Sequence, residues 1–369
     1  YDGAQDYDLL LRLLERTGKI FHIPKVLYHW RMINTSTSFN QDAKDYANSA
    51  GKAALEESLR RRRIEGEVQY TGTKYFYRVK RVLAQRPLIS IIIPFKDKQE
   101  YTEKCIHSIL KKSHYQNFEI IGISNNSIDN NTFEMMKRLE KADDRVKFLE
   151  LNIPFNYSKI NNYAASLANG SHIVLMNNDI EINTDGWIEA LLEHSQRDKI
   201  GAVGAKLYYP NNTVQHAGVI LGIAGFAGHS HRHAKRNSPG YFNRLNCVQN
   251  VSAVTGALLM VKKYLYERVG GLDEDNLGIA LNDIDFCLKL RKIDLLNILT
   301  PYCEAYHYES ASRGYESSPG KITRFENEIK YFKKKWRDYL AQGDPYYNCN
   351  LTLSYEDFSL NFDKNVSQE

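Results

Sequence analysis

The chain has 369 residues, of which 43% are hydrophobic and 12% aromatic, enough for one large or two smaller globular domains. The formal net charge of +5 is mild; it permits an anionic substrate or an acidic membrane surface, and we expect no nucleic-acid partner. No apolar run approaches the roughly 18 residues of a membrane-spanning helix. Five cysteines without paired spacing predict reduced thiols and a cytoplasmic location. The chain starts at Tyr1 within what reads as structured sequence, so we expect a fragment of a longer protein.

The first 87 residues predict a small helical region followed by a linker. Residues 8–15 and 42–62 are expected as helices, with the apolar run KIFHIPKVLYHW at 19–30 as a strand between them. Residues 63–87 are basic and irregular and end at Arg86-Pro87, which indicates a linker.

From residue 88 onward, strands and helices alternate. The run LISIIIPF (88–95) is apolar nearly throughout, as in a parallel strand that helices cover on both faces. Further strands are expected at 118–124, 146–151 and 172–176, and helices at 101–112, 131–141, 158–168, 283–292 and 321–339. This alternation predicts βαβ units and an α/β fold with a mostly parallel sheet flanked by helices.

Two distant segments of the chain are similar to each other. AQDYDLLLRLLERTGKIFHIPKVLYHWR (4–31) and LNDIDFCLKLRKIDLLNILTPYCEAYHYES (281–310) both place acid-x-acid at a helix start, then a proline, then a histidine between aromatic residues. A repeat at this distance indicates tandem domains. We therefore expect 1–62 to be the carboxyl-terminal remnant of one domain, 88–345 a complete copy, and 346–369 a tail.

The stretch LMNNDIEI (175–182) turns from apolar to acidic where a strand should end. Unpaired polar groups are costly inside a strand, whereas open α/β sheets bind ligands at the carboxyl ends of their strands. Asp179 could therefore hold a divalent cation together with a diphosphate. Alternatively, the stretch is a polar turn in which Asp179 caps the next helix, and the residues alone do not decide between the two.

Two further clusters carry possible chemistry. Asp283 and Asp285 open a helix, where one could cap the helix and the other act as a general base, or both could complement the helix dipole. His307 lies between two tyrosines, as packed histidines often do, but a neutral imidazole can also complete a metal shell. Arg313 and Lys321 could contact phosphate oxygens.

The remaining polar signals are less specific. Residues 94–97 follow the first strand and residues 124–127 follow the second, where side chains could contact a base and a ribose or form ordinary loops. A set of four histidines suggests a solvated loop or an acceptor-site lining in preference to zinc, because no acid or cysteine lies at ligand spacing. These histidines are His216, His229, His231 and His233.

Taken in order, these segments resemble an inverting family 2 glycosyltransferase of the GT-A fold, from about residue 88 to 314. The resemblance is carried by the order and spacing of ISIIIPFKDKQEYTEKCIHSIL, FEIIGISNNS, NYSKINNYAASLANGSHIVLMNND, GAVGAKLYYPNNTVQHAGV, VTGALLMVKK, VGGLDEDNLGIALNDIDFCLKLR and PYCEAYHYESASRG. It is most similar to the bacterial branch that builds cell-surface polysaccharides, including rhamnosyl- and galactofuranosyl-type enzymes. The amino-terminal remnant, with Asp6, Asp8 and His29, is then part of a second such domain and is expected to be inactive by itself.

The resemblance implies a role for each matching residue. Asp179 stands at the family's DxD motif as metal ligand, and His307 matches a histidine that joins the metal in some members. Asp283 matches the general base, with Asp285 and Arg313 in support. The nucleotide-sugar side is implied for Pro94, Phe95, Asp97, Ser124, Asn125, Asn161, Asn177 and Asn178, and the acceptor side for Thr255, Gly256 and Ala257. Two of these, Asn177 and Ser124, replace acids that the family usually carries, which leaves the nucleotide open.

The implied reaction moves a sugar from a UDP- or dTDP-linked donor, with Mn²⁺ or Mg²⁺, to a hydroxyl of a growing surface glycan or lipid-linked acceptor, with inversion. Basic runs at 60–63 and 333–335 are either solvated faces or contacts to an anionic acceptor at the inner face of the membrane. A sugar nucleotidylyltransferase is disfavoured, because PFKDKQEY contains no glycine-rich phosphate loop. A non-catalytic carbohydrate-binding or assembly module on the same fold stays open.

Overall fold

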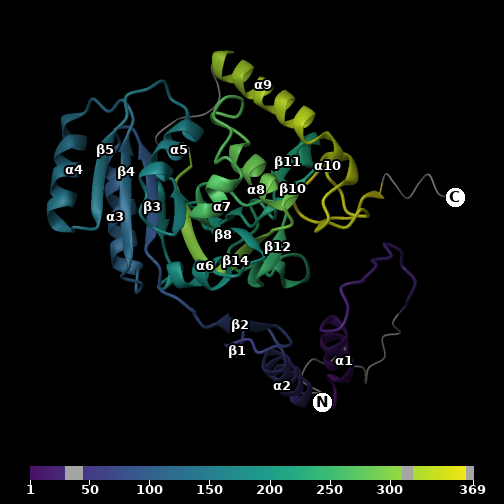
Figure 1. The fold of residues 1–369 in the computed structure, drawn as a ribbon. Helices are drawn as coiled ribbons and strands as arrows, with labels where there is room; N and C mark the ends of the chain where they lie inside the picture. The colour runs from purple at the N-terminus through teal and green to yellow at the C-terminus, as the bar shows by residue number, and fades with distance from the viewer. Residues whose placement is uncertain (30–44, 310–318, 363–369) are drawn as a thin grey trace. The chain divides into compact units, whose positions relative to one another are not determined.

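The structure is a computed structural model that describes residues 1–29, 45–309 and 319–362. Arg313 lies outside these residues, as does the start of the helix expected at 42–62. The chain divides into two compact units, Tyr1–Leu83 and Ala84–Glu369 (Figure 1).

The first unit contains two helices and a β-hairpin. α1 (Gln5–Leu14) packs against α2 (Asp45–Arg61), and β1 (Gly66–Tyr70) pairs antiparallel with β2 (Tyr77–Arg81). The expectation of an irregular linker at 63–87 is therefore wrong for residues 66–81. Val68 pairs with Val79 and is only 1% exposed, so a buried β-branched position inside a highly charged segment stabilises the hairpin.

The strand expected at 19–30 is absent from the described residues 19–29, which adopt neither helix nor strand. The apolar side chains of this segment are exposed, for example Phe21 at 88% and Val26 at 79%. A strand forms only where a neighbour completes its ladder of hydrogen bonds. Within the described part of the first unit, the only strands are β1 and β2, and they pair with each other. The apolar pattern of 19–29 therefore has no partner here.

The second unit is built on one mixed sheet with the strand order β12-β14-β8-β13-β6-β3-β4-β5; in addition, β7 pairs with β14 and β9 with β8. The strands are β3 (Ile89–Phe95), β4 (Phe118–Ser124), β5 (Val146–Glu150), β6 (His172–Met176), β7 (Ile180–Ile182), β8 (Ile200–Tyr208), β9 (Val214–His216), β12 (Gln249–Val251), β13 (Leu258–Lys262) and β14 (Leu296–His307). β6, β3, β4 and β5 are parallel, whereas β13 runs antiparallel between β6 and β8. The predicted α/β fold with a parallel central region is confirmed.

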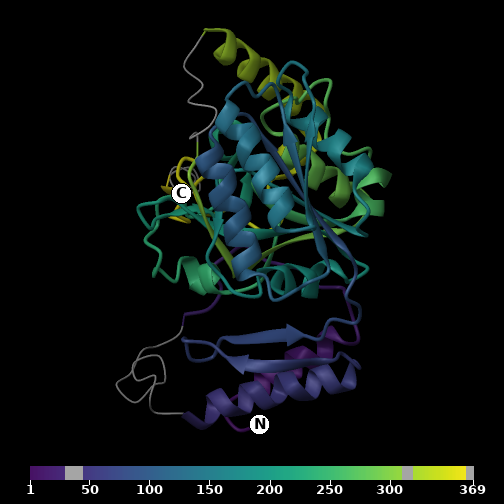
Figure 2. The same ribbon diagram turned by 90° about the vertical axis from the view of Figure 1, so that its left-hand side faces the viewer.

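Helices flank this sheet. They are α3 (Gln99–Lys112), α4 (Asn130–Ala142), α5 (Tyr157–Leu167), α6 (Trp187–Ser195), α7 (Lys263–Arg268), α8 (Asn282–Lys292), α9 (Pro319–Lys335) and α10 (Arg337–Gln342). α3 and α4 lie side by side along the sheet (Figure 2). α5, α8 and α9 share one apolar core with the strands through residues such as Ile160, Phe286 and Phe332. All seven residues of β3 are buried, as expected of a strand between two helical layers.

Residues after 345 do not form a free tail throughout. Leu351 and Phe358 pack against Ile220 and Ile223, and each of the four is 5% exposed. Ile220 belongs to a small hairpin of β10 (Val219–Leu221) and β11 (Ala227–His229), so the end of the chain covers an apolar surface that would otherwise face water. In the described part of the chain, no helix combines the length and the apolar character needed to cross a bilayer.

Candidate active site

The acidic turn of LMNNDIEI lies where β6 ends and β7 begins. β7 pairs antiparallel with β14, and the register places Ile180 opposite His307. As a result, Oδ1 of Asp179 lies 3.2 Å from Nε2 of His307. Both residues are buried, at 5% and 7% exposure. Strand pairing thus brings the two predicted metal ligands together from distant parts of the sequence.

Hydrogen bonds assign the proton of the neutral His307 ring to Nδ1. The side-chain oxygen of Gln215 lies 3.0 Å from Nδ1 and can only accept, so Nδ1 carries the proton and Nε2 presents a lone pair. Nε2 lies beside both the Asn177 side-chain amide nitrogen, at 3.3 Å, and Asp179, whose Oδ1 is buried and has no hydrogen-bond partner among the described residues. Two facing acceptors at 3.2 Å fit one divalent cation, because neighbouring ligands about 2.1 Å from an octahedral ion lie roughly 3 Å apart.

The protein supplies few ligands to such an ion. Across residues 1–29, 45–309 and 319–362, no group of three or more His, Cys, Asp or Glu side chains is arranged to hold a metal. Glu181 is engaged elsewhere, since it accepts from the Tyr308 hydroxyl at 2.7 Å and pairs with Lys104 at 2.9 Å. An ion at Asp179 and His307 would therefore take its other ligands from outside, as Mg²⁺-like ions do from substrate phosphates.

Asp283, the predicted base, lies at the start of α8 and is oriented by two backbone amides. The Gly256 amide donates to Oδ2 at 2.9 Å, and the Ile284 amide donates to Oδ1 at 2.8 Å. The carbonyl of Gly256 in turn accepts from the Tyr157 hydroxyl at 3.0 Å. The carboxylate is half-buried, so it is fixed in direction and still reachable from solvent.

One short segment connects Asp283, the predicted base, to the turn that carries Asp179. The backbone amide of Asn177 donates to the backbone carbonyl of Ala257 at 3.0 Å. Ala257 directly follows Gly256, whose amide binds Asp283. Consecutive Cα atoms are about 3.8 Å apart. Residues 255–257, which we call the floor segment, therefore contact both the acidic turn and Asp283.

Asp285 has different surroundings from Asp283. Its carboxylate is fully buried, accepts from the indole nitrogen of Trp336 at 2.8 Å and pairs with Lys335 at 2.8 Å. Residues two apart on a helix do not face the same side. Asp285 therefore holds the end of α9 against α8, while Asp283 points towards residues 255–257.

Two side chains predicted on the nucleotide side shape loops at the carboxyl edge of the sheet. Oδ1 of Asp97 accepts the amides of residues 128–129 at 2.9 Å each. The Asn125 amide nitrogen donates to the carbonyls of Leu151 and Ile153 at 2.7 and 2.9 Å. Their polar atoms stabilise the loops that follow β4 and β5.

The other residues predicted on that side are mostly buried. Pro94 and Phe95 end β3 inside the core, where the Phe95 ring lies edge-on to another aromatic ring. Ser124 donates to the Ser127 hydroxyl at 2.8 Å. Asn161 is fully buried, and its Oδ1 has no partner among the described residues. Asn161 thus keeps an acceptor atom that no residue of the described ranges uses.

The four predicted histidines do not form one cluster. His231 is buried and stacks on Phe358, and His233 is exposed. His216 and His229 contact each other, with Nδ1 atoms 2.8 Å apart. A solvated loop is therefore wrong for His216 and His231.

Sequence reasoning missed Gln215 and Tyr157, which orient the predicted metal ligand and the floor segment. Gln215 is the middle residue of the short strand β9 and Tyr157 is the first residue of α5, and polar residues at such positions are common. Their partners lie far away in sequence, so only the folded chain reveals the contacts.

Comparison with known sequences identifies the domain that carries this site. The sequence profile of glycosyl transferase family 2 matches residues 90–270. The chain contains a family 2 glycosyltransferase domain. The metal pair's Asp179 and the floor at 255–257 fall inside the matched part, whereas Asp283 and His307 follow it.

Two relatives are similar along 98% of the chain. An uncharacterised protein of Sinorhizobium fredii is 44% identical, and the O-antigen biosynthesis protein RfbC of Myxococcus xanthus is 36% identical. The chain spans only 40% and 28% of the length of these relatives. Both alignments therefore include the first unit as well as the glycosyltransferase domain.

A solved structure shares the fold of the glycosyltransferase domain. The mannosyltransferase PcManGT of Pyrobaculum calidifontis, in complex with GDP-Man and Mn²⁺, superimposes with a TM-score of 0.51 at 16% identity. The match covers 80% of this chain and 74% of the mannosyltransferase. Together with the family match, this likeness establishes the GT-A fold.

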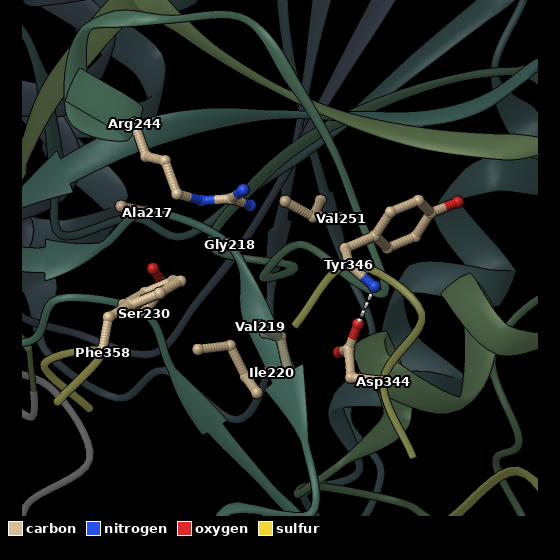
Figure 3. A pocket seen from close by; sticks show the side chains of 10 residues that line it. All are labelled: Ala217, Gly218, Val219, Ile220, Ser230, Arg244, Val251, Asp344, Tyr346 and Phe358. Atoms are coloured by element: carbon tan, nitrogen blue, oxygen red, sulfur yellow. Dashed lines mark hydrogen bonds between the residues drawn. The ribbon is translucent and has the colours of Figure 1, made fainter. Parts of the chain in front are cut away.

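The glycosyltransferase domain has a large open cavity formed by the segment before α8 and by α9, and none of the predicted site residues lines it. The cavity measures about 600 Å³ and is lined by residues 274–279, by α9 and by Phe155-Asn156. A second cavity, lined by Arg244, Asp344 and Phe358 among others, measures only about 10 Å³ (Figure 3). The small one has room for roughly one water molecule, so only the large one can accept a sugar residue.

Proposed function

We propose that this domain is a metal-dependent inverting glycosyltransferase that uses a nucleotide diphospho-sugar donor. The observation that carries the proposal is the pair of possible ligand atoms, Asp179 Oδ1 and His307 Nε2, that face each other at 3.2 Å. The same floor segment that contacts this turn also holds Asp283. A place for a cation and a fixed carboxylate base are what transfer from a diphosphate to a hydroxyl requires.

Asp179 and His307 would hold Mn²⁺ or Mg²⁺, and the ion would neutralise the diphosphate and so stabilise the leaving group. Gln215 binds Nδ1 of His307, so Nε2 would be the ligand atom once a cation displaces the Asn177 side-chain amide that lies 3.3 Å from it. PcManGT, of the same fold, was solved with Mn²⁺ and GDP-Man, which supports a cation here. Asn177, in place of the family's first acid, lies 3.3 Å from His307 Nε2 and would contact ribose or phosphate through its amide.

Asp283 would remove the proton from the acceptor hydroxyl. The two amides on its carboxylate fix its direction, and a positioned base contributes roughly 10²–10⁴-fold to the rate. The hydroxyl oxygen then attacks the anomeric carbon from the face opposite the diphosphate, and the configuration inverts. The acceptor would lie on the side of Thr255, Gly256 and Ala257, next to Asp283.

The donor and acceptor classes are inferred from a relative and from the family resemblance. The name of the Myxococcus relative supports a bacterial surface polysaccharide as product. We infer a UDP- or dTDP-linked donor and a rhamnosyl- or galactofuranosyl-type transfer from the family resemblance. We place the protein in the cytoplasm, at the inner membrane face, where free thiols persist; all five cysteines are free.

We also infer that residues 1–62 are the end of a second glycosyltransferase-type domain. In the repeat, Asp6 corresponds to Asp283, and the apolar residues of α1 correspond to buried ones of α8. Leu9 is 56% exposed where Phe286 is fully buried, so α1 presents the same surface without the sheet that covers it. The two longer relatives leave room for such a sheet.

A thermal-shift panel with UDP, dTDP, GDP and CDP, each with and without Mn²⁺, tests the cation and donor assignments. A nucleotide present at about 100 times its dissociation constant adds roughly 2.7 kcal/mol of stability. We expect a metal-dependent shift with one nucleotide. If no nucleotide shifts the transition, a non-catalytic carbohydrate-binding module on this fold becomes the better assignment.

The Asp283→Asn and Asp283→Ala variants test the base. Asparagine can still accept from the Gly256 amide, so Asp283→Asn should keep its stability while the transfer rate falls by about 10²-fold or more. Alanine should lose the rate equally and also about 1–3 kcal/mol, because the Gly256 amide is left unpaired. Full transfer by Asp283→Asn would rule out this assignment.

A further inference from the structure

His216 and His229 form a hydrogen-bonded pair beside the proposed acceptor side. His216 ends β9 and is fully buried, and His229 ends β11 and is half-exposed. Their Nδ1 atoms lie 2.8 Å apart, with the rings nearly perpendicular at 86°. A fully buried imidazole needs partners for both nitrogens, and the second partner of His216 is the floor segment.

The backbone amide of Thr255 donates to Nε2 of His216 at 3.3 Å. Because Nε2 accepts, the proton of the neutral His216 ring must be on Nδ1, which donates to Nδ1 of His229. His229 is then protonated on Nε2. Burial, and next the neighbouring His229, lower the pKa of His216 well below its usual value of 6.5, which is consistent with a neutral ring. One arrangement of protons therefore satisfies the whole chain of contacts.

This chain of contacts ends at the proposed base. Thr255 donates to His216, and the next amide, that of Gly256, donates to Asp283 at 2.9 Å. The two amides belong to consecutive residues. A change in the contact between Thr255 and His216 therefore also reorients the Gly256 amide that donates to Asp283. The Tyr157 hydroxyl holds the Gly256 carbonyl from the other side, at 3.0 Å.

We propose that His216 and His229 are positioning residues that set the direction of the Asp283 carboxylate through Thr255 and Gly256. This inference rests on the proposed function, because it assigns the pair a role in activating the acceptor. His229 fixes the tautomer of His216, and His216 fixes the floor. Neither histidine needs to contact the substrate.

Variants of His216 separate positioning from simple packing. In His216→Gln the side-chain oxygen can replace Nε2 as acceptor, whereas His216→Phe fills the space and leaves the Thr255 amide unpaired. A misplaced group costs up to about 100-fold in rate, so we expect kcat of His216→Phe to fall about 10–100-fold with the donor KM within about twofold of wild type. His216→Gln should recover kcat to within about threefold of wild type. His233→Gln, at an exposed histidine outside the pair, is the control and should match wild type.

A second readout does not depend on activity. In ¹H–¹⁵N spectra the amide signals of Thr255 and Gly256 should move in His216→Phe and stay near wild type in His216→Gln. Loss of kcat in both variants equally, or unmoved amide signals in a folded His216→Phe, would overturn the proposal. If wild type transfers no sugar from any donor, the proposed function fails, and the amide signals still decide whether the pair holds the floor.

Discussion

At the scale of single residues, we expect a substitution of the buried Asp179 not to destabilise the protein, whereas most substitutions at buried positions do. Its Oδ1 is buried 3.2 Å from Nε2 of His307. This oxygen accepts no hydrogen bond from the described residues. In Asp179→Asn the amide can donate to His307 Nε2, so without metal the variant should be as stable as wild type or about 1 kcal/mol more stable. The metal-dependent thermal shift should disappear together with transfer. A variant that still responds to Mn²⁺ with nucleotide would place the ion elsewhere.

Asp179 could be predicted from the residues because it interrupts an apolar pattern where a strand should end, whereas the roles predicted for Asp283 and His307 came from the family resemblance. The sequence could not predict Gln215 or His216 as partners, since β9 reaches the site only by pairing with β8. Polar side chains whose hydrogen bonds cross between elements have no local signature. The family resemblance gave the ligands, and the folded chain gave the groups that orient them.

At the scale of elements, the contact between α8 and α9 depends on one buried carboxylate. Asp285 binds the Trp336 indole and Lys335, and so attaches the helix that lines the large cavity. Trp336→Phe keeps an aromatic side chain but removes one of the two donors to Asp285 Oδ1, the other being Lys335, and should destabilise the domain by about 1–3 kcal/mol in urea unfolding. Asp285→Ala, which removes the acceptor of the same hydrogen bond, should cost at least as much.

Because both changes remove the same hydrogen bond, the double variant should cost less than the sum of the two. Lys334→Met, at an exposed neighbour, is the control and should leave stability unchanged within about 0.5 kcal/mol. Additive effects would mean that the indole and the carboxylate act independently.

The elements that sequence reasoning placed wrongly share one cause. The apolar run at 19–29 reads as a strand, but strand formation needs a neighbour that the described chain does not provide. Within residues 66–81, β1 and β2 are each other's neighbours. Their many charged side chains made the alternation of apolar and polar residues around Val68 and Val79 hard to recognise in the sequence. Helix ends were predicted closely because caps and periodicity are local, whereas strand pairing is not.

At the scale of the whole molecule, buried histidines predict a loss of stability in mild acid. Burial lowers the pKa of His172 and of His231 to about 4, from 6.5. Between these values the unfolded chain binds more protons than the native one, so stability falls as the pH drops from 6.5 towards 4. Each histidine should account for about 1–2 kcal/mol between pH 7 and pH 5.

Urea unfolding at both pH values measures this difference. In the native protein the Tyr241 backbone amide donates to Nε2 of His231 at 3.0 Å, and the side-chain oxygen of His231→Gln can accept this hydrogen bond instead. The stability difference between pH 7 and pH 5 should then shrink by the contribution of one histidine, about 1–2 kcal/mol. His233→Gln serves as the exposed control. Equal stability of the wild type at pH 5 and pH 7 would contradict the prediction.

The first unit bears on whether the whole chain is one member of a tandem arrangement. Leu10 and Leu14 of α1 are 57% and 55% exposed, as are most apolar side chains of 19–29. Exposed apolar surface of this kind marks a binding face or causes association.

Residues 84–369 alone should therefore keep donor binding and self-associate less than the full chain in analytical ultracentrifugation. Leu10→Lys with Leu14→Lys in the full chain should have the same effect on association, which assigns it to the α1 surface and not to chain length. If neither change reduces association, the surface is covered within this chain, and the inferred second domain loses its main structural support.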